Sequence, residues 1–175
     1  MIELASADGL PSRAQAVRDF ARSELFDRTF QEGMALVEEC AAYLDGEGRR
    51  DSKLLSRAGA LAYAGESMRL TTRLMQVASW LLVQRAVREG DMDAAEACLP
   101  RYRIGGQSVC QGGDAIEGGE NLPEGLLDLL ERSQRLYERV LWLDTRMFTA
   151  EAPEEAPNPV LSQLERLQQA LGAQA

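Results

Sequence analysis

Hydrophobic residues cover an unusually wide arc of residues 63–88 when this segment is projected as a helix. At 100° per residue the arc is roughly 160–200°, whereas a helix that faces one neighbour needs only a little over ~100°. The pattern therefore predicts a helix with apolar partners on two sides. We expect the excess apolar surface to be buried in an oligomer. The residues on the arc are Tyr63, Met68, Leu74, Met75, Ala78, Leu81, Leu82 and Ala86.

One narrow stripe of the same helix is polar and spans roughly 80° of the projection. It could be a solvated stripe, whose intrahelical pairs from Glu66 to nearby arginines contribute only about 0.2–0.5 kcal/mol each. It could instead be a recognition face for dimerisation or partner capture, because Trp80 supplies apolar area and arginine binds carboxylates. This stripe is the candidate binding surface. Its members are Glu66, Arg69, Arg73, Gln76, Trp80 and Gln84.

Two further helices are expected beside this central one. Apolar residues recur at threes and fours in residues 23–44, after a serine suited to an N-cap. The central helix should extend over residues 51–89 with Gly90 as its stop, and a third helix should follow from about residue 121 to 148. The sequence thus predicts an all-α three-helix bundle with a long central helix over residues 23–148. We expect antiparallel neighbours packed near about +20° and a C2 homodimer.

The remaining segments carry weaker signals. Residues 1–22 are expected to form an arm, partly disordered or a short helix, and residues 101–123 a glycine-rich loop. Residues 149–175 begin as an acidic, proline-rich linker and end in a short amphipathic helix. That helix could cap the bundle, contact a second subunit, or dock in a partner's groove as a recognition segment. Its apolar stripe contains Leu161, Leu164, Leu167 and Leu171.

Composition narrows the class of protein further. The 175 residues carry a net charge of −9, which disfavours nucleic-acid binding because neutralising phosphates requires a basic face. No apolar run is long enough to span a bilayer, and no apolar leader follows Met1, so we expect a cytoplasmic protein without membrane insertion. The three cysteines lack paired spacing, which favours free thiols.

Candidate chemistry is sparse. The chain has no histidine, which removes the usual metal ligand and the usual proton shuttle, and with them hydrolytic triads. The glycine-rich loop lacks the Lys-Ser/Thr pair of a phosphate-binding loop. Cys98 and Cys110 lack neighbouring ligands, and the acidic residues lack the Glu-x-x-His pairs of a dimetal bundle. We therefore expect no catalytic residue, no metal and no cofactor.

Two strings of the sequence resemble the alphaproteobacterial regulators of CtrA degradation (RcdA). They are ESMRLTTRLMQVASWLLVQRAV at residues 66–87 and EGMALVEECAAYLDGEGRRDSK at residues 32–53, and the resemblance spans about residues 25–148. It implies a non-enzymatic, cytoplasmic, helical adaptor that helps to deliver cell-cycle regulators such as CtrA to the ClpXP protease. The implied partners are a ClpX-type unfoldase, response regulators and substrate transcription factors, with recruitment to a cell pole if the family role holds.

Two other functions fit the residues. The first is a small all-helical enzyme of the chorismate-mutase kind, in which Arg69, Arg73, Gln76 and Gln84 would clamp a dianionic substrate. It would require these polar groups to face an enclosed cavity, whereas the apolar arc already occupies the inward side. The second is a structural or regulatory bundle with an unrelated partner, which the residues alone do not separate from an adaptor.

Overall fold

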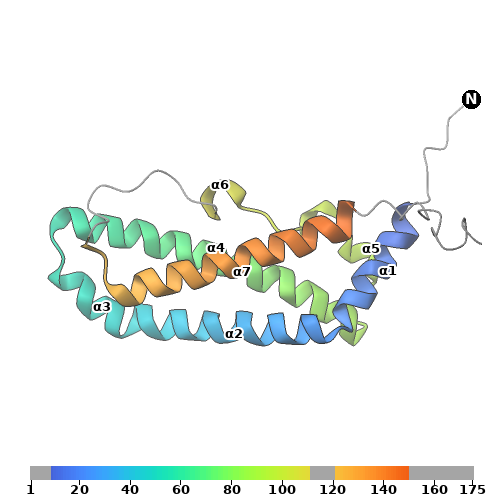
Figure 1. Cartoon of the computed structure of the whole chain (residues 1–175), viewed down its shortest axis with the longest axis horizontal. Helices are drawn as coiled ribbons and strands as arrows, with labels where there is room; N and C mark the ends of the chain where they lie inside the picture. The colour runs from blue at the N-terminus through green and yellow to red at the C-terminus, as the bar shows by residue number, and fades with distance from the viewer. Residues whose placement is uncertain (1–8, 111–120, 150–175) are drawn as a thin grey trace, which may run out of the picture.

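Three long helices lie side by side and form the body of the molecule (Figure 1). They are α2 (Glu24–Asp45), α4 (Arg57–Glu89) and α7 (Glu124–Thr149). The arrangement is that of a computed structural model, which describes residues 9–110 and 121–149. No strand occurs in these two ranges, so the expected all-α class is confirmed.

Helix α2 begins where the sequence predicts. Ser23 has an extended backbone, and its hydroxyl oxygen accepts a hydrogen bond from the Phe26 amide at 3.1 Å, as an N-cap should. At the other end the Gly46 amide donates to the carbonyls of Ala42 and Tyr43. Local signals are therefore sufficient to place both ends of this helix.

The central helix starts later than expected. The segment before it forms α3 (Glu47–Asp51) and a 3₁₀ turn, η1 (Ser52–Leu54), and Leu55 is then extended. Helix α4 begins only after Ser56, which acts as its N-cap. The prediction of one continuous helix from residue 51 is therefore wrong, because the serine that caps the helix lies five residues further on, after the 3₁₀ turn.

The end of α4 agrees with the sequence. Gly90 has φ +84°, in the left-handed region that glycine adopts without the steric cost of a Cβ. The helix contains 33 residues, and at 1.5 Å per residue it is about 50 Å long. It is therefore long enough to contact α2, α7 and the short elements at both ends of the body.

Helices α4 and α7 run in the same direction, and α2 runs opposite to both (Figure 1). Arg73 of α4 contacts Ser133 of α7. Trp80, which comes later in α4, contacts Asp144, which comes later in α7. The expected antiparallel packing of the second and third helices is therefore wrong. The reason is the long segment between them, which returns to the first end of α4 before α7 begins.

That returning segment contains short helices along part of its course. They are α5 (Ala94–Ala97), the 3₁₀ turn η2 (Pro100–Tyr102) and α6 (Gln107–Cys110). The last two occupy the first half of the segment expected as a glycine-rich loop. Helix α6 lies beside α4 and α7 midway along the body (Figure 1).

The N-terminal helix α1 (Gly9–Ala21) crosses one end of the three long helices (Figure 1). Its Val17 side chain is fully buried, and the Phe20 ring lies 5.5 Å from the Trp80 ring and 5.8 Å from the Phe26 ring. This helix therefore closes the core at the end where α4 finishes. The leucine stripe predicted in the C-terminal segment lies outside the described residues. None of the helices that the structure describes is both long and apolar enough to cross a membrane.

Candidate functional site

The structure separates the six residues of the predicted polar stripe. Arg73, Trp80 and Gln84 are buried, with 3%, 2% and 1% of their surface exposed. Glu66, Arg69 and Gln76 are partly exposed. The expectation that the whole stripe faces outward is wrong, because α1, α6 and α7 cover the side of α4 that a single-helix projection leaves open. Whether the exposed members bind a partner stays a prediction.

Arg73 joins three helices through its guanidinium group. Its Nε and Nη2 atoms both donate to the Cys110 carbonyl of α6, at 3.0 and 2.8 Å. Its Nη1 atom donates to the Leu130 carbonyl at 3.1 Å and to the Ser133 hydroxyl at 2.8 Å, both on α7. The three acceptors of these four hydrogen bonds are neutral, and burial lowers the pKa of Arg73 from its usual value.

Trp80 makes the second polar link between α4 and α7. Its indole Nε1 donates to the Asp144 carboxylate at 2.9 Å, and only 1% of Asp144 is exposed. The other carboxylate oxygen accepts two hydrogen bonds from Arg103, at 3.1 and 2.9 Å. The Arg103 guanidinium also lies over the Phe148 ring, 4.5 Å from its centre. The sequence contains no signal that pairs Asp144 with Trp80, since 64 residues separate them.

The other stripe residues have separate environments. Glu66 and Arg69 form an ion pair at 3.4 Å within α4. The Gln76 side-chain oxygen accepts a hydrogen bond from the Gly105 amide at 3.3 Å. The Gln84 side-chain oxygen is buried and has no hydrogen-bond partner among the described residues. The stripe is thus a set of structural contacts along α4 and not one convergent site.

A different face of α4 is apolar and exposed. Four large side chains stand on it at intervals of seven residues, and their exposed fractions are 66%, 72%, 63% and 50%. Smaller residues, among them Thr71 and Ala78, lie beside them. Seven-residue spacing keeps side chains on one face of a helix, which is the pattern of a helix–helix seam. We call this face the α4 seam, and its residues are Leu61, Met68, Met75 and Leu82.

An apolar hollow lies next to the α4 seam, between α2 and α4. Its volume is about 210 Å³, and its walls carry almost no polar surface. The Met75 side chain belongs both to the seam and to the hollow. The lining residues are Val37, Cys40, Ala41, Leu44, Thr71, Leu74, Met75 and Ala78.

Groups capable of covalent or metal chemistry are not assembled in the described part of the chain. No cluster of three or more His, Cys, Asp or Glu residues is placed there to hold a metal ion. Burial raises the pKa of the thiols of Cys40, Cys98 and Cys110, which makes them poorer nucleophiles than ordinary cysteines. What the described surface offers most clearly is apolar area for binding.

Comparison with known proteins assigns the family. A crystal structure of RcdA from Caulobacter crescentus CB15 is 65% identical to this chain, covering 75% of it and 97% of that chain, with a TM-score of 0.61. The chain belongs to the RcdA family. The family model described as "Protein of unknown function (DUF1465)" matches residues 17–171, which include every long helix of this RcdA-like fold. No curated protein matches the chain. The resemblance carried by residues 32–53 and 66–87 is therefore confirmed.

Proposed function

We propose that this RcdA-family protein is a non-enzymatic adaptor that binds other proteins and helps to deliver cell-cycle regulators such as CtrA to the ClpXP protease. Its partners are a ClpX-type unfoldase, response regulators and substrate transcription factors, and it acts in the cytoplasm. The family membership supports the choice of partners. The observation that supports a binding protein is the α4 seam, where four large apolar side chains are at least half exposed.

The size of the α4 seam suits reversible binding. Full burial of one Leu or Met side chain is worth about 1.5–3 kcal/mol. The four side chains are 50–72% exposed in the single chain, so burying the rest of each contributes about 4–8 kcal/mol per copy before association costs. Those costs are estimated at about 4–15 kcal/mol for two proteins. The gain and the cost are comparable, so the seam supports a complex that forms and dissociates. The hollow beside Met75 offers further apolar contact.

A second copy of the chain is the occupant that we propose for the α4 seam. Two copies of the same helix present the same seven-residue repeat, and such a self-complementary patch produces a twofold dimer. The small residues Thr71 and Ala78 would let the two helices approach closely. The excess apolar arc of residues 63–88 is then buried, as the sequence analysis expects of an oligomer.

The dimer is tested by sedimentation of the full chain over a range of concentrations. We expect the Met68→Glu and Met75→Glu variants to sediment as monomers. Both should have the melting temperature that the wild-type protein reaches at low concentration, because both side chains are mostly exposed in the single chain. Leu127→Glu is the matched control, since Leu127 is 47% exposed on α7, away from the seam. A wild-type protein that stays monomeric at every concentration would contradict the dimer.

The delivery role is tested with purified components. The immobilised chain should retain ClpX and a CtrA-type response regulator, and adding the chain should speed degradation of the regulator by ClpXP. Failure to retain either protein, together with an unchanged degradation rate, would refute this role. The alternative of a chorismate-mutase-type enzyme gains no support, because the donors of Arg73 are directed at protein acceptors and Gln84 lies three turns further along α4.

A further inference from the structure

The contacts of Arg73 differ from those of most buried arginines. An arginine carries its positive charge at every physiological pH, and buried charges are normally paired with an opposite charge. Arg73 is 3% exposed, yet within residues 9–110 and 121–149 its hydrogen bonds reach two backbone carbonyls and one hydroxyl, and no carboxylate. The groups in direct contact with the charge are therefore neutral dipoles, and the carboxylates of Glu66 and Glu138 act on it only from a distance.

The two Arg73 donors that would bind the two oxygens of a carboxylate share one carbonyl oxygen here. The Nε and Nη2 atoms of a guanidinium form the edge that binds the two oxygens of a carboxylate in parallel. In Arg73 both atoms donate to one oxygen, the Cys110 carbonyl. A carboxylate in the same place would supply one oxygen to each donor and add a negative charge. Charge-assisted hydrogen bonds of this kind are roughly twice as strong as neutral ones.

The element that occupies the edge is short and partly exposed. Helix α6 has four residues, and Ser108 and Val109 within it are exposed. The Cys110 side chain is fully buried. Just before α6, Gly106 has φ +73°, a conformation that glycine adopts without the cost of a Cβ. Segments with little buried apolar area and mostly polar contacts open at a small fraction of the free energy of global unfolding.

We propose that Arg73 is a carboxylate-binding site covered by α6, and that an Asp, Glu or C-terminal carboxylate of a bound protein displaces the Cys110 carbonyl. In the closed state α6 satisfies the guanidinium. In the open state the carboxylate takes the Nε and Nη2 donors, and Ser133 and Leu130 keep the Nη1 donor. The proposal depends on the protein-binding function for the source of the carboxylate, but the site is separate from the α4 seam.

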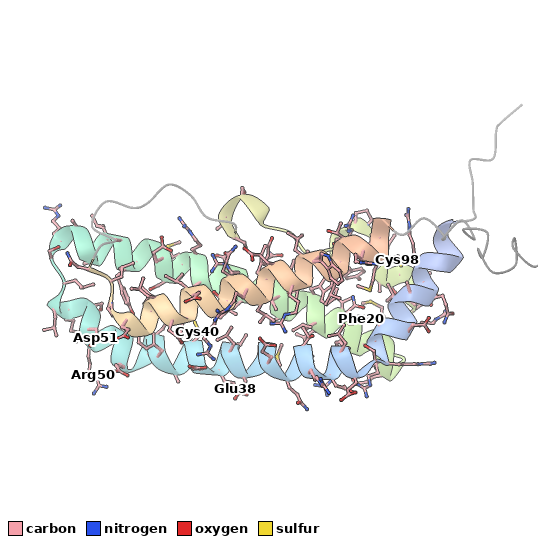
Figure 2. The ribbon with its side chains drawn as sticks, in the orientation of Figure 1. Phe20, Glu38, Cys40, Arg50, Asp51 and Cys98 are labelled. Carbon is pink, nitrogen blue, oxygen red and sulfur yellow. The ribbon has the colours of Figure 1, made fainter. Side chains whose placement is uncertain are left out.

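The three cysteines of the chain report the opening of α6 without any engineering. The Cys110 side chain is fully buried against Arg73 and Tyr137, so it reacts with N-ethylmaleimide when α6 lifts. Cys40 is 3% exposed on α2 (Figure 2), on the wall of the hollow between α2 and α4, so its labelling reports the body of the molecule independently of α6. Cys98 is partly exposed, so its labelling rate serves as the reference for the activity of the reagent. Mass spectrometry of the labelled full chain separates the three rates.

The decisive experiment compares an acidic peptide, Glu-Glu-Leu-Glu-Glu-Leu, with its glutamine counterpart carrying a C-terminal amide. We expect the acidic peptide to accelerate Cys110 labelling while Cys40 labelling stays constant, and the neutral peptide to leave both unchanged. Unchanged Cys110 labelling with the acidic peptide would overturn the proposal. An equal rise at Cys40 would also overturn it, because the peptide would then unfold the protein.

Two variants connect the response to Arg73. Arg73→Met should raise Cys110 labelling at least about tenfold, which corresponds to about 1.4 kcal/mol of opening free energy, and should abolish the response to the acidic peptide. Arg69→Met is the matched control and should keep the wild-type response. If Arg73→Met fails to fold, Tyr137→Phe replaces it. That variant removes a 2.9 Å hydrogen bond to the Gly105 carbonyl, so it should loosen α6 and enhance the peptide response. A response that survives in Arg73→Met, or disappears in Tyr137→Phe, would refute the site.

Discussion

Replacement of Trp80 tests most directly whether the predicted stripe belongs to the core. Trp80 is 2% exposed, packs on Phe20 of α1 and donates to the buried Asp144 carboxylate. A Trp→Ala change in a core costs about 3–5 kcal/mol through lost packing and the cavity left behind. The vacated Asp144 oxygen adds about 1–3 kcal/mol for an unmet hydrogen bond. We therefore expect Trp80→Ala to remove at least about 4 kcal/mol, a large part of the roughly 5–15 kcal/mol of a typical domain.

The assay is urea unfolding followed by circular dichroism at two protein concentrations, because dimer formation makes apparent stability depend on concentration. Trp80→Phe is the informative companion, since it keeps most of the apolar volume and removes only the indole donor. It should cost about 1–3 kcal/mol, the range expected when a buried acceptor loses its partner. A Trp80→Ala protein within about 1 kcal/mol of wild type would refute the placement of this side chain, since surface substitutions usually stay within about 0.5 kcal/mol.

Three further predictions follow from packing, charge and chain length. Gly33→Ala should destabilise the protein by up to about 2 kcal/mol in urea unfolding. Its new Cβ would lie 2.7 Å from Cδ1 of the buried Leu81, and the overpacking cost of about 1–3 kcal/mol is reduced by about 1 kcal/mol of helix propensity. The hydrogen bond from Arg132 lowers the pKa of Glu39, so this pair should stabilise the fold above the unfolded-state pKa and lose that effect as pH falls through the lower folded-state pKa. The loss should be under about 1 kcal/mol for such an exposed pair and should vanish in Glu39→Gln. Removal of residues 150–175 should leave the cooperative melting transition in place, and its collapse would show that this segment is part of the core.

The sequence predicts the elements of this fold better than their arrangement. Capping signals at Ser23 and Gly90 locate helix ends because they act within a few residues. The direction of α7 relative to α4 depends on where the connecting segment travels, which periodicity does not encode. The length of the connecting segment does indicate that α7 is not a simple antiparallel neighbour of α4, since a chain that turns back at once needs few residues.

The candidate site was harder to predict than the fold. A helical projection groups Arg73 with Arg69 and Trp80 but does not say which neighbour covers them. The third layer formed by α1 and α6 decides their burial, and its contacts join residues far apart in the sequence. By contrast, the seven-residue repeat of the α4 seam is visible in the sequence. A helical projection does not distinguish it, because it groups the seam residues with the core residues in one wide apolar arc. Burial separates the part of that arc that faces the core from the part that faces outward.

The two interior polar links between α4 and α7 also fix the alignment of the body. Along α4 the donors Arg73 and Trp80 are seven residues apart, whereas their α7 acceptors Ser133 and Asp144 are eleven apart. A slip of α7 by one or two turns cannot restore both links, and it would leave the Nη1 atom of Arg73 or the indole donor of Trp80 buried without its acceptor. Contacts between leucines, in contrast, tolerate such a slip, because successive helical turns present apolar side chains of similar size. These few polar atoms therefore disfavour shifted packing arrangements of α7 on α4 that the apolar contacts alone would tolerate.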